Sequence, residues 1–273
     1  MSDKPFAPNI SLKLFMSIDF ESYTAAFLEF AESYEENNQQ DCSAIRLKID
    51  HSLRVFENAR TIIEHNTIGS QLGDAAMLAA LFHDIGRFPQ YQKYRTFNDK
   101  KSVNHGHLGV NVLKKLKILR DLPGECQQYV LSAIALHNKN KIPGHVSPSL
   151  QIICNILRDS DKLDIFKVMV EHFSRVDNDP SVALEAIPHP DNYSRQMYDN
   201  VYYGRPCLYE DIYWTNDFKL ILANWSYHLN FSISYTIFHD SGLFELIFKH
   251  LPRKDEFNVL KKKLQAVIEE RKL

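Results

Sequence analysis

Apolar side chains recur at steps of three and four residues along most of this sequence, a spacing typical of amphipathic α-helices. Alternating apolar and polar runs, which would indicate strands, are few. Glycine is also scarce, with 9 in 273 residues. Together these features predict an all-α fold class. The stripe is clear near the N-terminus, in Phe20, Tyr23, Phe27, Phe30 and Tyr34.

The apolar period predicts helices at about 19–34, 43–65, 74–84, 104–119, 123–137, 147–173, 210–231, 232–251 and 255–271. Two segments between them show no sustained period and are predicted to be loops, 86–103 and 177–210. Long loops in compact proteins are often functional. Because no internal repeat or linker interrupts the chain, we expect a single all-α domain over residues 1–273.

Composition gives no indication of a nucleic-acid-binding, membrane or disulfide-rich protein. The net charge is -2 and the pI is about 6.6, so bulk electrostatics give no strong nucleic-acid or membrane signal. The four cysteines form no CxxC pair and are interpreted as isolated thiols in a reducing compartment. No signal peptide and no stretch of about 18 apolar residues is present. We therefore expect a cytoplasmic protein.

Two adjacent polar residues, His83 and Asp84, end an apolar run, which is an unfavourable place unless something pairs with them. Four further polar residues occur in similar helical contexts: His51, His105, His137 and Asp161. With His83 they are separated by 32, 22, 32 and 24 residues in chain order. Each step is about the length of two antiparallel helices. A helical bundle can bring such positions to one level, and imidazole and carboxylate groups suit a divalent metal. Gly86 is expected to let the helix end, so that His83 and Asp84 could both reach one ion.

Four segments of this pattern resemble the HD-domain superfamily of metal-dependent phosphohydrolases. They are Asp50–Val55, Leu81–Arg87, Asn104–Gly109 and Arg158–Asp164. The resemblance covers about residues 45–175. It implies an HD-domain-like helical bundle with additional C-terminal helices, the extension covering about 176–273.

The resemblance also implies a ligand set. His51, His83, Asp84 and Asp161 would hold one divalent metal, and its register selects Asp161 rather than Asp159 or Asp164 as the last ligand. His105 and His137 would hold a second metal or contact phosphate, with His107 as a rival to His105. The ion or ions could be Mn, Fe, Ni, Co, Zn or Mg.

The function implied is hydrolysis of a phosphate ester or anhydride by a metal-activated water. The substrate would be a nucleotide or another small phosphorylated metabolite. Asp84 would orient the water or bridge two metals, and Arg87 would neutralise phosphoryl charge unless it is an ordinary exposed charge. Asn138 stands where cyclic-dinucleotide phosphodiesterases of the superfamily have a second histidine, which argues against cyclic-di-GMP hydrolysis.

Several alternatives stay open at this point. The six-residue pattern also suits a di-iron oxygenase of the HD fold, and a non-catalytic nucleotide-binding regulatory module would keep the same bundle. Asp159 is interpreted as a surface charge and Asp164 as a partner of Lys or Arg. His239-Asp240 repeats the dipeptide outside the ordered pattern and is interpreted as coincidence. Substrate, metal number and oligomeric state are not set by the sequence, and specificity is expected from 86–103 and 177–210.

Overall fold

The computed structural model describes residues 18–35, 39–174 and 186–272, and the described chain is helical as predicted. The first seven helices are α1 (Phe20–Glu32), α2 (Gln39–His65), α3 (Ser70–Phe82), α4 (Arg87–Tyr94), α5 (His105–Leu116), α6 (Gly124–Leu136) and α7 (Pro148–Ser174). They are followed by α9 (Arg195–Tyr202), α10 (Thr215–Asn224), α11 (Ser232–Asp240), α12 (Leu243–Lys249) and α13 (Asp255–Arg271). In the described ranges the β-structure is a single bridge between Ile187 and Trp214.

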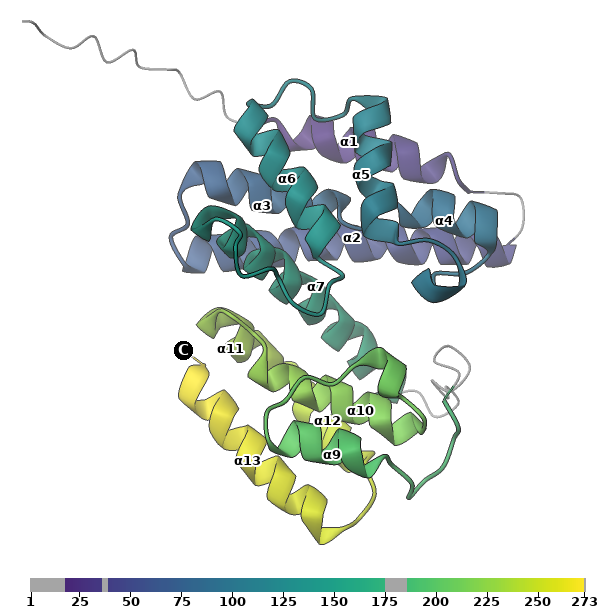
Figure 1. Cartoon of the computed structure of the whole chain (residues 1–273), viewed down its shortest axis with the longest axis vertical. Coiled ribbons are helices and arrows are strands. Elements are labelled where there is room, and N and C mark those ends of the chain that lie inside the picture. The colour runs from purple at the N-terminus through teal and green to yellow at the C-terminus, as the bar shows by residue number, and fades with distance from the viewer. Residues whose placement is uncertain (1–17, 36–38, 175–185, 273) are drawn as a thin grey trace, which may run out of the picture.

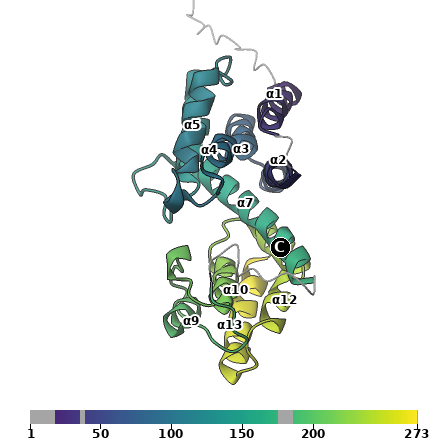
Figure 2. The same cartoon turned by 90° about the vertical axis from the view of Figure 1, so that its right-hand side faces the viewer.

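The helices form two groups on either side of α7 (Figure 1). Helices α1 to α6 lie on one side and α9 to α13 on the other, and the view in Figure 2 shows the same separation. Helix α7 packs against α2, α3 and α6 of the first group and against α11 and α12 of the second. Buried apolar residues from both groups belong to one core cluster. The single-domain organisation stays a prediction.

Local signals set several helix starts as the sequence predicts. The Asp19 carboxylate accepts the Ser22 N–H at 3.1 Å and so caps α1. Ser147 accepts the Leu150 N–H at 3.2 Å, with Pro148 as the first residue of α7. These side chains satisfy backbone amides that have no partner inside the helix.

The predicted loop at 86–103 is wrong in its first half. It contains α4 and a short 3₁₀ turn, η1 (Asp99–Lys101). Pro89 falls in the first turn of α4, where its missing N–H costs nothing, and Phe88 is buried in the core. The sequence period missed α4 because an 8-residue helix that buries two residues is too short to show one.

Gly86 has a different role from the one expected. Its φ is -68°, so it is not a left-handed cap. A Cβ at this position would clash with the His105 carbonyl oxygen and lie 2.6 Å from the Gly109 amide nitrogen. Glycine is therefore required because the start of α4 meets the backbone of α5.

The C-terminal half also departs from expectation. The predicted loop at 177–210 contains α9 and the 3₁₀ turn η2 (Tyr209–Asp211), while its residues 177–185 lie outside the described part. The predicted helix at 210–231 is reduced to α10 and the 3₁₀ turn η3 (Trp225–Tyr227). The predicted helix at 232–251 divides at Gly242, whose φ of 73° cannot continue a helix.

Candidate metal centre

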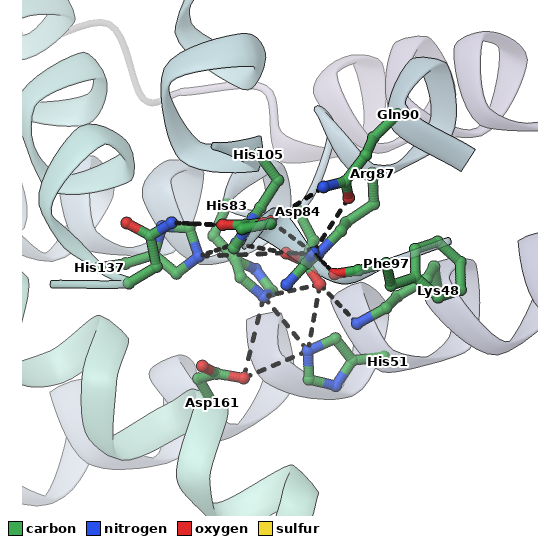
Figure 3. Close-up of polar contacts among 12 residues, drawn as sticks. Lys48, His51, His83, Asp84, Arg87, Gln90, Phe97, His105, His137 and Asp161 are labelled. Atoms are coloured by element: carbon green, nitrogen blue, oxygen red, sulfur yellow. Dashed lines mark hydrogen bonds and ion pairs between the residues drawn. The ribbon is translucent and has the colours of Figure 1, made fainter. Parts of the chain in front are cut away.

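The first helix group and α7 bring all six predicted ligands together (Figure 3). His51 comes from the middle of α2, His105 is the first residue of α5, and Asp161 comes from α7. His83 and His137 are the C-cap residues of α3 and α6, and Asp84 follows His83. The imidazoles and Asp84 are buried, whereas 27% of the Asp161 side chain is exposed.

The imidazoles meet in two pairs. The Nε2 atoms of His51 and His83 lie 3.2 Å apart, and His51 Nε2 is 3.2 Å from Asp161 Oδ1. The Nε2 atoms of His105 and His137 lie 2.9 Å apart. Two overlapping sets have donor atoms within 4.8 Å of one another, as a metal ion requires: His51, His83 and Asp161, and His83, Asp84 and His137.

The outer nitrogen of every imidazole has a fixed acceptor. Two Nδ1 atoms contact carbonyl oxygens one turn back, at 2.8 Å for His83 with Ala80 and 2.7 Å for His137 with Ile134. The Nδ1 atoms of the other two contact carboxylates, His51 that of Asp164 at 2.6 Å and His105 that of Asp99 at 2.7 Å. All four Nε2 atoms are therefore left to face the centre.

This arrangement fits a metal cation. Carbonyl oxygens only accept, so Nδ1 of His83 and His137 carries the hydrogen. Burial lowers the pKa of both imidazoles, that of His137 to about 3, so both are neutral with a lone pair on Nε2. Each lone pair points at the Nε2 of a second histidine, and a divalent cation between them would satisfy both nitrogens.

Asp84 lies between the two imidazole pairs. Its Oδ2 is 3.7 Å from Nε2 of His51, and its Oδ1 is 3.3 Å from Nε2 of His105. Lys48 donates to Oδ2 at 2.8 Å, and Arg87 Nε donates to Oδ1 at 3.3 Å. Burial would raise the pKa of this carboxyl, but the neighbouring positive charges outweigh burial and hold the pKa well below its usual range. Asp84 is an anion that offers one oxygen to each pair.

Two carboxylates contact the Nδ1 atoms of His51 and His105, on the side of each ring that faces away from the centre. The sequence did not assign them to the site. Asp164 contacts His51 and also accepts from Arg54, which confirms its interpretation as a partner of Arg. Asp99 contacts His105 and accepts from Arg87 at 3.0 Å. Its pKa is lowered to about 2, because hydrogen bonding and charge outweigh the desolvation that would raise it. No local pattern around position 99 marks this role, which follows from the turn η1.

The structure also decides the roles of the other charged and histidine residues considered from the sequence. Only 15% of the Arg87 side chain is exposed, so Arg87 is not an ordinary exposed charge. His107 is exposed, and His105 is the histidine at the centre. The surface interpretation of Asp159 is wrong, because its buried carboxylate accepts the Asn230 N–H at 2.8 Å. Lys48 was missed, although its place one turn before His51 on α2 is the signal that could have found it.

A scan against protein-family models matched the HD domain over residues 49–187, slightly more than half of the chain. The chain therefore belongs to the HD-domain family, whose members are mostly metal-dependent phosphohydrolases. This confirms the resemblance and the all-α fold class. Searches of curated proteins and of solved structures found no match. Among the described residues, no helix is both long and apolar enough to cross a membrane.

Proposed function

We propose that this protein is a metal-dependent phosphohydrolase that cleaves a phosphate ester or anhydride of a nucleotide or other small phosphorylated metabolite. One observation carries the proposal. Four imidazole Nε2 atoms converge with the carboxylates of Asp84 and Asp161, while each Nδ1 is already held by an acceptor. Membership of the HD-domain family supports the reaction class.

Two neighbouring ions would suit the donor set. His51, His83 and Asp161 would hold one and His105 and His137 the other, with the Asp84 carboxylate between the two sets. When bound, a divalent ion polarises a phosphoryl oxygen and lowers the pKa of a coordinated water toward neutrality. The facing pairs of imidazoles, 3.2 Å and 2.9 Å apart at Nε2, support this division.

The protein side chains would orient the water and offset charge. The Asp84 carboxylate is fixed by Lys48 and Arg87 and can accept a hydrogen bond from the attacking water. The same two cations would stabilise negative charge that develops on phosphoryl oxygens beside Asp84. Arg87 is preorganised for this role because Asp99 and Gln90 hold its guanidinium at 3.0 Å each.

Phosphate release from a panel of nucleotides, cyclic dinucleotides and sugar phosphates, with Mn²⁺ added, tests the proposal together with metal analysis of the purified protein. We expect metal-dependent release that chelation abolishes. His83→Ala and Asp84→Ala should each lower kcat about a thousandfold, roughly 4 kcal/mol of transition-state stabilisation. His107→Ala, an exposed imidazole two residues from His105, is the matched control and should keep activity within about twofold.

Full activity in a chelated sample, or in either variant of the dipeptide, would contradict the proposal. Oxygen uptake by iron-loaded protein without phosphate release would favour the oxygenase instead. Tight nucleotide binding without turnover across the panel would favour the regulatory module.

A further inference from the structure

The ring of Phe97 contacts both cations that hold the Asp84 carboxylate. Lys48 Nζ lies over this ring, 5.4 Å from its centroid, and Arg87 Cζ lies 6.0 Å from the same point. Both distances are within the reach of the attraction between a cation and an aromatic face. Figure 3 shows the ring beside the Lys48 ammonium. Phe97 therefore joins two charged side chains that come from different helices, α2 and α4.

The segment between α4 and α5 fixes the position of Phe97. Its carbonyl oxygen accepts a hydrogen bond from Nη1 of Arg87. The same nitrogen donates to the Asp99 carboxylate, which begins η1 two residues further on. Tyr91 of α4 stacks on the Phe97 ring, with centroids 4.8 Å apart and the two planes inclined by 29°. Backbone and ring are thus both held in place beside Asp84.

An aromatic ring is suited to hold Lys48 because it attracts the ammonium without cancelling its charge. Lys48 has a flexible four-carbon stem, and it reaches Asp84 Oδ2 at 2.8 Å with 19% of its side chain exposed. A second carboxylate at this place would fix the ammonium and also neutralise it. The negative face of a ring carries no net charge. The positive charge therefore stays available to phosphoryl oxygens.

Resting on the proposed function, we propose that Phe97 is a positioning residue whose ring holds the Lys48 ammonium beside Asp84, where it meets the phosphoryl group of the substrate. Phe97 acts through Lys48 and does not touch the reacting atoms. Arg87 depends on the ring less, because Asp84 and Asp99 already bind its guanidinium. A change in the ring should therefore matter only while Lys48 is present.

A double-mutant cycle tests this dependence on Lys48. Titration calorimetry measures the Kd of inorganic phosphate for the full chain in saturating Mn²⁺, and kcat/KM is measured with the fastest substrate of the phosphate-release panel. Phe97→Leu keeps an apolar side chain without the ring, and should raise the phosphate Kd about fivefold and lower kcat/KM by a similar factor. The same change in a Lys48→Met background should alter both by less than twofold.

Fluorination separates the charge distribution of the ring from its shape. 3,4,5-Trifluorophenylalanine at position 97 keeps the outline of the ring but removes most of the negative potential of its face. The phosphate Kd should then rise toward the value of Phe97→Leu. Phe97→Tyr keeps the negative face and should stay within about twofold of wild type. A ring that only fills space would tolerate fluorine without loss.

Tyr94 provides the matched control. It is an aromatic residue of α4, and Nζ of the exposed Lys93 lies 5.1 Å from its ring centroid. Tyr94→Leu therefore removes a contact of the same kind that involves neither Lys48 nor Arg87. It should leave the phosphate Kd and kcat/KM within twofold of wild type.

Four results would overturn the inference: wild-type protein that binds no phosphate, an unchanged Kd in Phe97→Leu, an equal loss in both Lys48 backgrounds, or fluorinated protein that behaves as wild type. The proposed function fails separately. Phosphate affinity that follows the ring, in a protein that releases no phosphate from any panel compound, would refute hydrolysis and keep the positioning role. Hydrolysis that is indifferent to the ring would do the reverse.

Discussion

At the scale of single residues, the orientation of the imidazoles depends on carboxylates that lie outside the centre. His51 and His105 present Nε2 correctly because carboxylates accept from their Nδ1 atoms. Such carboxylate–histidine contacts orient the ring and raise its basicity as a metal ligand. Both carboxylates also pair with an arginine, but the Asp164 side chain is fully buried whereas 28% of the Asp99 side chain is exposed.

Asp164→Asn should weaken Mn²⁺ binding about 10- to 100-fold, because the amide keeps the shape but cannot accept from both His51 and Arg54 through two anionic oxygens. Titration calorimetry on the purified variant measures this. Asp50→Asn changes an exposed carboxylate next to His51 on α2 and should leave the affinity unchanged. An unaltered affinity in the Asp164 variant would show that the contact does not position His51.

At the scale of helices, the contact between α4 and α5 sets the separation of Asp84 from His105. Gly86 and Gly109 lie at this contact, where backbone meets backbone. The opposing atoms at Gly86 are a carbonyl oxygen and an amide nitrogen, and neither can rotate away as a side-chain end could. This packing brings the second imidazole pair to the same carboxylate as the first.

Gly86→Ala should lower the free energy of unfolding by about 2–3 kcal/mol, because an added methyl group has no space and the backbone must shift. Urea denaturation followed by circular dichroism measures the loss. Gly124→Ala is the matched control, since no atom lies within 4 Å of the added Cβ and alanine favours a helix. That control should gain up to about 1 kcal/mol. A stable Gly86 variant would mean that α4 and α5 can separate freely.

The features that could be predicted are those with local signals. The last helix has its predicted bounds, 255–271, because acidic residues at its start and an apolar stripe mark it within one segment. The dipeptide His83-Asp84 could be found because two polar residues end an apolar run, and its partners could be found from their ordered spacing together with the resemblance to the HD-domain superfamily. Asp99 could not be assigned, because its role exists only once η1 packs beside His105 and Arg87. Gly86 was misread for the same reason, since its neighbour is α5 rather than its own helix.

At the scale of the whole molecule, α7 joins the two helix groups through polar contacts as well as apolar ones. Asp159 accepts from the backbone amides of Asn230 and Phe231 at 2.8 and 3.2 Å. Lys162 donates to the His228 carbonyl at 2.8 Å. These anchors alternate along α7 with Asp161 of the candidate metal centre.

Acidification should weaken this junction through His228. Its pKa is lowered to about 4 by burial and by the positive charges of Lys162, Arg158 and Arg271. The unfolded chain has an ordinary histidine pKa near 6.5. The folded state therefore binds fewer protons than the unfolded state between these values, and its stability is lost as pH falls from about 6.5 toward 4.

We expect His228→Gln to remove about 1 kcal/mol of the stability difference between pH 7.5 and pH 5, after allowing for the partial exposure of the ring. Urea denaturation gives the free energy of unfolding of wild type and variant at both pH values. The change between pH 7.5 and pH 5 is then compared between the two proteins. His65→Gln, an exposed histidine on α2, serves as the control. Identical pH dependence in wild type and His228→Gln would rule out the effect.

The phase of α7 restricts where the length of this chain can change during evolution. A residue inserted before Asp159 would turn everything after it by about 100° and move it by about 1.5 Å. Asp159, Asp161 and Asp164 would then lose their partners in one step. Insertions and deletions are therefore expected in the connection 139–147, before the helix begins, and not within it. The C-terminal helix group and the candidate metal centre both depend on the same spacing of residues along α7. Replacing either part with a homologous segment therefore requires that the number of α7 residues between them stays the same.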